Sequence, residues 1–305
     1  MMKMNKLNDE KRVDIYQMVT DKIVAILESE NVGKWLKNWK VGKSCNAESK
    51  REYSGINSLL LQIEANIKDY PTNSWLTFKQ VSKLGGKIKK GGHGTFITYY
   101  NLVEIEVENK EGELEKKKLP ILRYFFVFNV AQIENLPEEF YSTKAIISTD
   151  ERISNAEELI STILKETGIQ VKFGGGVACY NLISDKIKMP KFEVFNTPMD
   201  FYATYLHELV HSTGNKNRLN RDSMITKSKD SYAFEELIAE IGSSFLNSCL
   251  GVSGNIQNHA NYIASWLVAL KNDKKAIFKA SRLAQEASNY LLKLGGLKED
   301  ENNGG

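Results

Sequence analysis

The sequence has few cysteines, few histidines and no long apolar run. Its cysteines, Cys45, Cys179 and Cys249, stand far apart in 305 residues and form no CxxC pair. This pattern argues against a disulfide framework and against a cysteine-based zinc cluster. No apolar stretch approaches the roughly 18 residues that a membrane span needs, and the charged N-terminus lacks the apolar core of a signal peptide. These absences predict a cytoplasmic protein that makes no contact with a membrane.

The remaining composition is that of an ordinary folded protein. Hydrophobic residues make up 42% of the chain and charged residues 26%, so a sizeable core can form. A chain of 305 residues favours two domains. The formal net charge of +3 is too small to identify a nucleic-acid-binding protein by itself, so the distribution of charge matters more than its sum.

The first half mixes helical and strand-like patterns. Apolar residues at three- and four-residue spacing predict an amphipathic helix over 9–29, and a short apolar helix follows around 59–67. Thr77 with Gln80 can form a capping box at the start of another short helix. Two strand-like runs, over 95–107 and 119–131, flank a turn and predict an antiparallel hairpin.

The second half is mainly helical. Strand-like pieces precede a helix for which Thr197 is a good N-cap residue and Pro198 a good first residue. Helices are predicted over 154–166, 198–213, 232–249, 258–271 and 274–294, and strands near 169–173, 177–182 and 186–189. The expected fold class is α+β with two domains. The expected boundaries are an N-terminal domain over 1–136, a linker over 137–152, a C-terminal domain over 153–296 and a disordered tail over 297–305.

The segment His207-Glu208-Leu209-Val210-His211 is an HExxH motif in the predicted helix 198–213. Histidines four residues apart project from one face of a helix, so both rings can bind one zinc ion. Glu208 lies beside them and is the expected general base that activates a water molecule. The motif therefore predicts a zinc-dependent metallopeptidase with one Zn²⁺ per chain.

A catalytic zinc site needs a third protein ligand and an open position. The downstream segment offers Glu236 and Glu240, which share a helix face at the margin of an apolar stripe. We expect Glu236 to be the third ligand and Glu240 to orient a ligand histidine, although the exchanged roles stay open, and we expect Glu235 to be solvated. His259 and Tyr262 are candidates for stabilising the oxyanion.

A strand just upstream of the metal helix is expected to align an extended substrate at a sheet edge. The candidate strand is 186–189. An ordinary hairpin with no substrate role explains the same pattern equally well.

Basic and aromatic residues alternate in parts of the first half, a pattern that suits single-stranded nucleic acid. Lysines neutralise phosphates and aromatic rings stack on bases, although tryptophans are more often core residues and lysines more often solubilise. The candidate contacts are Lys34, Trp35, Lys37, Trp39, Lys40, Tyr53, Asn57, Lys79, Lys87, Lys89 and Lys90.

The assembled motifs resemble the ArdC-type antirestriction proteins of conjugative plasmids and phages. The stretches that carry the resemblance include Tyr53-Ser-Gly-Ile-Asn57, Trp75-Leu-Thr-Phe-Lys-Gln80, Tyr124-Phe-Phe-Val-Phe-Asn-Val130, Tyr205-Leu-His-Glu-Leu-Val-His211 and Glu235-Glu-Leu-Ile-Ala-Glu240. The resemblance spans roughly 10–294, and Ser212 stands where the family usually has a tryptophan. It implies an N-terminal domain that binds single-stranded DNA, with duplex DNA as a second candidate ligand, and a zincin-like metallopeptidase domain. It also implies protection of incoming DNA from host restriction.

Two other functions fit the same residues. One is a non-enzymatic DNA-protecting protein whose metal is structural. The other is a dedicated protease without a DNA role, in which the basic first half docks a protein substrate.

Overall fold

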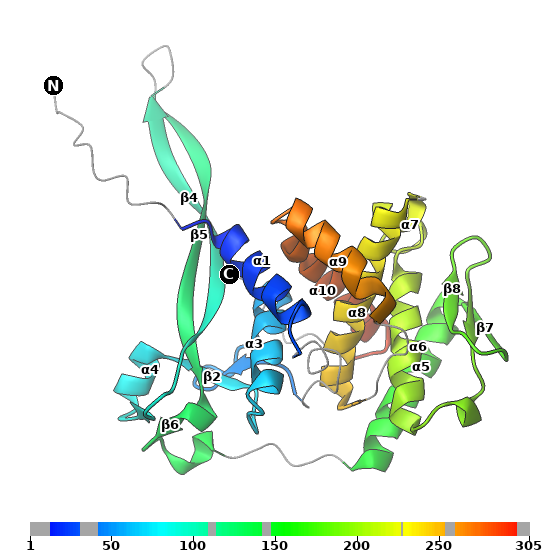
Figure 1. The fold of residues 1–305 in the computed structure, drawn as a ribbon, viewed down its shortest axis with the longest axis horizontal. Coiled ribbons are helices and arrows are strands. Elements are labelled where there is room, and N and C mark those ends of the chain that lie inside the picture. Colours follow the sequence, from blue (N-terminus) through cyan, green and yellow to red (C-terminus); the bar gives the residue numbers. More distant parts are fainter. Residues whose placement is uncertain are drawn as a thin grey trace.

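The computed structural model describes residues 13–30, 42–108, 114–141, 148–226, 228–253 and 260–297. Within these residues the chain forms a strand-rich N-terminal half and a helical C-terminal half (Figure 1), which confirms the predicted α+β class with two domains. In the described part of the chain, no helix combines the length and apolar character needed to cross a membrane.

The N-terminal half is organised around a long hairpin. Strand β4 (Thr95–Glu108) pairs antiparallel with β5 (Leu114–Asn129), as predicted. The sheet continues through β2 (Ser74–Thr77) to β1 (Cys45–Asn46), in the order β1-β2-β5-β4. A second, two-stranded sheet joins β3 (Lys87–Ile88) to β6 (Ile133–Glu134). These four short strands were not predicted, because none is long enough to show a periodic pattern of apolar residues.

Helix α3 (Gly55–Ile67) packs against the hairpin and is fastened to it by one side chain. Asn57 donates from Nδ2 to the Thr98 carbonyl at 2.7 Å and accepts from the Thr98 backbone N–H at 2.7 Å. Beneath the helix, Leu61 and Trp75 are fully buried in a small cluster with Val127. Helix α4 (Phe78–Lys83) begins with the predicted capping box between Thr77 and Gln80.

The C-terminal half places helices beside a three-stranded sheet. The helices are α5 (Thr149–Thr167), α6 (Pro198–Thr213), α7 (Asp222–Ile225), α8 (Lys229–Leu250), α9 (Ala260–Asn272) and α10 (Ala276–Leu294). The strands are β7 (Gln170–Phe173), β8 (Cys179–Asn181) and β9 (Lys186–Met189), in the order β7-β9-β8.

The predicted start of helix α5 was wrong. Helix α5 begins at Thr149, with Ser148 as its N-cap accepting from the Glu151 backbone N–H, and not at Ser154. Residues 149–152 of the predicted linker are therefore helical. The pattern around Ser154 and Glu157 is also a capping sequence, and it hid the earlier one at Ser148. The domain boundaries themselves stay a prediction.

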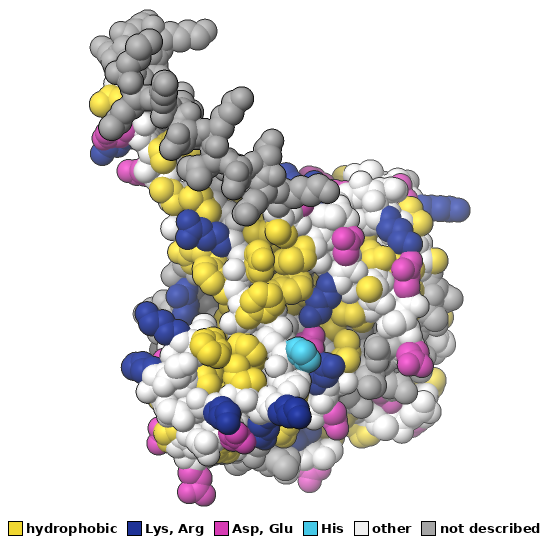
Figure 2. Space-filling view, turned by 60° about the vertical axis from the view of Figure 1, so that its left-hand side comes forward, with side chains coloured by type: hydrophobic (Ala, Val, Ile, Leu, Met, Phe, Trp, Pro, Cys, Tyr) yellow, Lys and Arg dark blue, Asp and Glu magenta, His cyan; other side chains and the backbone are white. Residues whose placement is uncertain are grey.

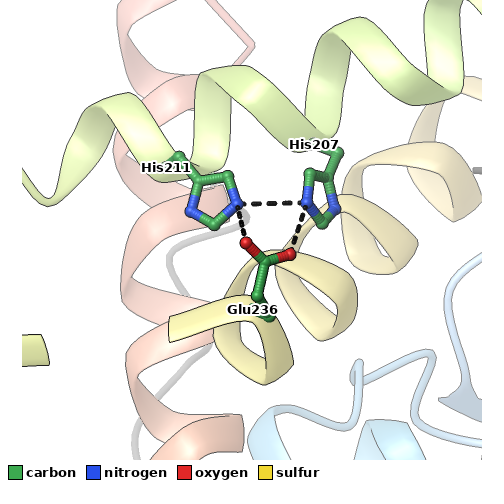
Figure 3. Close-up of side chains that lie close together, drawn as sticks. All are labelled: His207, His211 and Glu236. Atoms are coloured by element: carbon green, nitrogen blue, oxygen red, sulfur yellow. Dashed lines mark hydrogen bonds and ion pairs between the residues drawn. The ribbon is translucent and has the colours of Figure 1, made fainter. Parts of the chain in front are cut away.

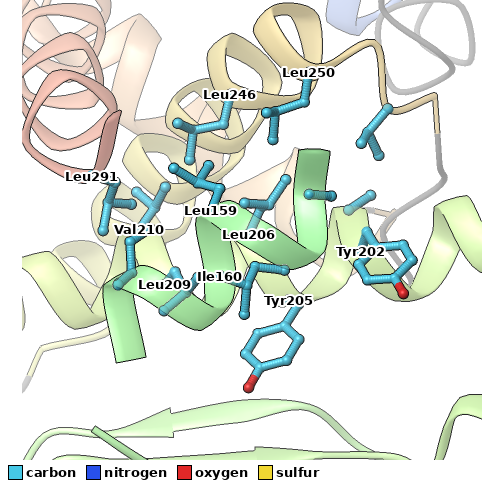
Figure 4. Packing of buried hydrophobic residues seen from close by; sticks show 14 of the residues in the cluster. Leu159, Ile160, Tyr202, Tyr205, Leu206, Leu209, Val210, Leu246, Leu250 and Leu291 are labelled. Carbon is cyan, nitrogen blue, oxygen red and sulfur yellow. The ribbon is translucent and has the colours of Figure 1, made fainter. Parts of the chain in front are cut away.

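Two large apolar clusters hold the helices together. The first packs α5, α6, α8 and α10 through residues such as Leu159, Leu206, Leu246 and Leu291 (Figure 4). Each fully buried leucine stabilises the fold by about 1.5–3 kcal/mol relative to an exposed one. This cluster surrounds α6, so the helix that carries the HExxH motif is buried along its entire length.

The second cluster joins the two halves of the chain. Helix α1 (Ile15–Leu27) contributes Val19 and α3 contributes Leu60, and both pack with residues of α8, α9 and α10 such as Ile241 and Trp266. The Trp266 indole N–H donates a hydrogen bond to the Ala233 carbonyl at 3.0 Å. The apolar faces of α1 and α3 are thus covered by helices from the C-terminal half.

Candidate metal centre

Helix α6 presents the HExxH residues toward α8. It begins as predicted, with Thr197 accepting from the Asp200 backbone N–H and Pro198 as the first helical residue. The two helices can approach closely because Gly242 of α8 faces α6. A β-carbon at Gly242 would lie 2.9 Å from Cγ1 of Val210, too near for a side chain. This close packing brings the α8 carboxylates within reach of the α6 histidines.

Three side chains from the two helices converge on one point (Figure 3). The Nε2 atoms of His207 and His211 lie 3.1 Å apart. One carboxylate oxygen of Glu236 lies 3.5 Å from the His207 Nε2, and the other lies 3.5 Å from the His211 Nε2. All three residues are buried.

This donor set fits a divalent metal ion such as zinc. Four-coordinate zinc with bonds of about 2.1 Å holds neighbouring donor atoms about 3.4 Å apart, close to the separations seen here. Burial raises the pKa of Glu236, but the two histidines outweigh it and hold that pKa well below its usual 4.5. The carboxylate is therefore ionised, as a ligand must be.

Glu240 occupies a different place from Glu236. Its carboxylate lies 3.8 Å from Nδ1 of His207, the ring nitrogen that points away from the convergence point. This Nδ1 has no hydrogen-bond partner among the described residues, so a small movement of Glu240 would satisfy it. Glu236 thus faces both Nε2 atoms, whereas Glu240 lies behind one ring.

The expectation that Glu235 is solvated is wrong, because the residue is 2% exposed. Its carboxylate lies 3.4 Å from Nδ1 of His211, accepts from the Ser223 hydroxyl at 2.6 Å, and forms a buried ion pair with Arg221. Burial lowers the pKa of His211, but contact with Glu235 and Glu236 raises it to about 10. This network was not predicted, because Arg221 lies 14 residues upstream of Glu235, after an irregular segment.

The convergence point opens into a cleft of about 650 Å³, whose lining includes His207, Glu208, His211 and Glu236. Two tyrosines also line it, and their hydroxyl oxygens lie 3.2 Å apart: Tyr262, expected from the sequence, and Tyr232, which was missed. Partial burial, together with the Tyr262 hydroxyl, raises the pKa of Tyr232, so its hydroxyl stays a hydrogen-bond donor at neutral pH. His259 lies outside the described residues.

The strand expected to align a substrate was chosen wrongly. Strand β9 lies between β7 and β8 in the sheet, so it has no free edge. Strands β7 and β8 are the two edges of this sheet, and of these β8 lies at the cleft, which its residues Cys179 and Tyr180 line. The Tyr180 hydroxyl is held by Asp185 at 2.6 Å and by the Arg218 guanidinium at 3.0 Å, which fixes this edge beside α6.

The residues expected to contact DNA do not form one cluster in the described structure. Lys79, Lys87, Lys89 and Lys90 are exposed in and around α4 and β3. Asn57 holds the hairpin, and Tyr53 packs on the Leu61–Trp75 cluster, so structural roles account for both. Lys34, Trp35, Lys37, Trp39 and Lys40 lie outside the described residues.

Comparisons with known proteins match both halves. Residues 13–128 match the family described as the N-terminal domain of anti-restriction factor ArdC, and residues 158–283 match a zincin-like metallopeptidase family. The metal-free crystal structure of antirestriction ArdC protein from the R388 plasmid is 35% identical, with a TM-score of 0.76, and the match covers 94% of this chain and all of that one. The chain belongs to the ArdC antirestriction family. The resemblance inferred from the motifs is thereby confirmed.

Other relatives extend the family. The uncharacterized protein y4eC of Sinorhizobium fredii (strain NBRC 101917 / NGR234) is 31% identical over 289 residues, which is 91% of each chain. A DNA primase TraC of Escherichia coli is 29% identical over 309 residues, and the chain spans only 20% of that relative's length. A Mn(II)-bound structure of the R388 ArdC protein matches with a TM-score of 0.72 at 35% identity.

Proposed function

We propose that this ArdC-family chain is a zinc-dependent metallopeptidase that also binds single-stranded DNA and protects incoming plasmid or phage DNA from restriction. The convergence of His207, His211 and Glu236 at the base of the cleft carries the metallopeptidase part of the proposal. The Mn(II) bound to the R388 protein supports a divalent cation at this site. Zinc is the cation that suits two imidazoles and one carboxylate best.

The residues at the metal site have separate roles in the proposed reaction. The ligands are His207, His211 and Glu236, and Glu235 and Glu240 orient the two rings from behind. A bound zinc ion supplies Lewis acidity and makes water easier to deprotonate. Glu208, which lines the cleft beside the ligands, accepts the proton from the attacking water and passes it to the leaving amine.

The tyrosine pair and the sheet edge provide the remaining contacts. The hydroxyls of Tyr232 and Tyr262 donate hydrogen bonds to the carbonyl oxygen as it becomes an oxyanion. The free edge of β8 pairs with the backbone of an extended peptide and presents its scissile bond to Glu208.

The shape of the cleft favours hydrolysis over a structural metal. Structural zinc sites are closed by four protein ligands, whereas three ligands at the base of an open cleft leave a position for water and substrate. Membership of the ArdC family and the likeness to TraC primases favour a DNA role over a protease that acts without DNA.

The metal is tested by elemental analysis of the purified protein. We expect one zinc per chain in the wild type and almost none in His207→Ala. Equal zinc in both proteins contradicts the site.

The need for hydrolysis is tested with Glu208→Gln, which keeps all three ligands. The measurements are cleavage of a quenched-fluorescent peptide mixture and survival of incoming DNA in a restricting host. We expect the variant to bind zinc normally but to lose both cleavage and protection. Intact protection in this variant would instead favour a non-enzymatic protector.

A further inference from the structure

A row of aromatic side chains follows one face of β5. Alternate residues of a strand point to the same side, which places Tyr124, Phe126 and Phe128 on one face of the hairpin. Phe78, the first residue of α4, extends the row, since its ring centroid lies 6.5 Å from that of Phe128. The Tyr124 and Phe126 centroids are 5.8 Å apart. The row thus consists of four rings from two elements, in two contacting pairs.

Three of these four rings are unusually exposed for aromatic side chains, whereas Phe128 is half-buried against the apolar cluster around Leu76. Phe78 is 64% exposed, Phe126 is 51% and Tyr124 is 36%. Figure 2 shows hydrophobic side chains gathered along the hairpin and below it, bordered by Lys and Arg side chains. Contiguous apolar patches are costly on a soluble surface and mark interaction sites.

The segment that connects β3 to β4 passes beside the row at a glycine, Gly94. Gly94 lies so close that a β-carbon there would be 2.9 Å from Cβ of Phe126 and 3.1 Å from Cζ of Phe128. Only a residue without a side chain fits this position. The segment that connects β3 to β4 can therefore pass beside the row without hiding it.

Positive charge borders the same end of the row. Lys79 follows Phe78 directly, and Lys90 lies in the segment that leads to Gly94. Both lysines are exposed, and neither pairs with a carboxylate of the residues that the structure describes. Lys87 contributes less, because it lies opposite Glu134 in the β3–β6 pair. Free ammonium groups beside flat apolar rings are complementary to a phosphate backbone with unpaired bases.

We propose that this row is the surface on which successive bases of single-stranded DNA stack, with the phosphates running along Lys79 and Lys90. The inference rests on the proposed DNA binding and assigns it to a surface. Alternate strand residues recur about every 7 Å, so neighbouring rings can each take one base of an extended strand. Stacking requires no particular sequence, but it does require unpaired bases. Duplex DNA is therefore a poor ligand for this surface.

The test is fluorescence anisotropy of a labelled 20-nucleotide oligothymidine with the full chain. Phe126→Ala is expected to weaken binding about 5- to 100-fold, the usual cost of losing one base-stacking ring. Two controls should bind like the wild type: Phe173→Ala, equally exposed at 51% but on β7, and Phe125→Ala, 47% exposed on the opposite face of the hairpin. Equal losses in Phe125→Ala and Phe126→Ala overturn the assignment to this face.

Lys79→Ala separates the phosphate contact from stacking. It is expected to lower the slope of log affinity against log salt by about 0.7, whereas Phe126→Ala leaves that slope unchanged. Phe126→Trp keeps a stacking ring, so wild-type affinity and quenching of the new tryptophan by bound DNA are expected. This variant is informative even if the alanine variant folds poorly.

The two levels of the proposal fail in different ways. If the wild type does not bind oligothymidine, both the DNA part of the proposed function and this inference fall. If the wild type binds but Phe126→Ala binds as tightly and Phe126→Trp shows no quenching, only the surface assigned here is wrong. Equal affinity of the wild type for duplex and single-stranded DNA likewise overturns stacking on this row.

Discussion

Replacing Arg221 tests whether the metal centre depends on a charge that never touches the metal. Arg221 is 4% exposed and forms an ion pair with Glu235, and it also donates to the Val210 carbonyl at 2.9 Å and to the Thr213 hydroxyl. Arg221→Met keeps most of the side-chain volume but removes every one of these donors. The Glu235 carboxylate then stays buried and, among the residues that the structure describes, keeps only the Ser223 hydroxyl and His211 as partners.

The expected loss of stability is large. Breaking a buried ion pair by removing one partner costs about 3–5 kcal/mol, because the remaining charge stays desolvated. Urea unfolding of the metal-free protein measures this loss directly, since bound metal adds stability of its own. Arg282→Met is the matched control, because Arg282 forms an exposed pair with Glu286. That substitution should cost less than about 1 kcal/mol.

A double variant and a metal titration complete the test. Adding Glu235→Gln to Arg221→Met should recover part of the lost stability, because the unpaired charge is gone. Zinc affinity should fall about 10- to 100-fold in Arg221→Met, since Glu235 no longer holds the His211 ring in place. If Arg221→Met is no less stable than Arg282→Met, the buried pair does not support the site and the reasoning is refuted.

Further predictions concern the ligands, the helix packing and pH. Glu240→Gln should weaken zinc binding about 10- to 100-fold, and Glu236→Gln should weaken it considerably more. Calorimetry measures both affinities, and equal losses would contradict the roles assigned to the two residues. Gly242→Ala should destabilise the fold by about 1–3 kcal/mol, because the β-carbon of the alanine would press into α6. An unchanged free energy of unfolding in urea would argue against the close contact of the two helices. Burial raises the pKa of Asp185, but Arg218 and Tyr180 lower it below 3.8 overall. The ionised Asp185 carboxylate therefore stabilises the fold above about pH 3.8, and this contribution is lost as the pH falls through its lowered pKa. Between pH 6 and pH 2, the free energy of unfolding of the wild type should fall more steeply than that of Asp185→Asn.

The sequence was most informative where a local pattern specifies a local structure. The capping residues of α6 and α4 and the two strands of the hairpin were predicted correctly, because caps and alternation depend on near neighbours. The approach of Glu236 to the two histidines was expected from its place on the margin of an apolar stripe. The order of the small sheet was not accessible, because a strand's neighbours are set by packing and not by its own residues. The sequence therefore could not show that β8, and not β9, has the free edge.

Features that depend on distant contacts were missed for the same reason. Glu235 looked solvated since its partner Arg221 follows an irregular segment, and Tyr232 gave no signal until the fold placed its hydroxyl beside that of Tyr262. The aromatic run in β5 predicted a strand but did not indicate which of its side chains are exposed. Tyr124 is 36% exposed and Phe126 51%, and such exposure depends on which distant elements pack on the sheet, which no strand pattern encodes.

The shared packing of α1 and α3 with α8, α9 and α10 has an evolutionary consequence. Recombination between the segments that match the two families, 13–128 and 158–283, would leave each fragment with an uncovered apolar face. Gene rearrangements that carry both segments together leave neither apolar face uncovered. In two TraC primases, the region that matches 93% of this chain makes up 20% and 27% of the primase. Inheritance of both segments together as one unit would produce such a match.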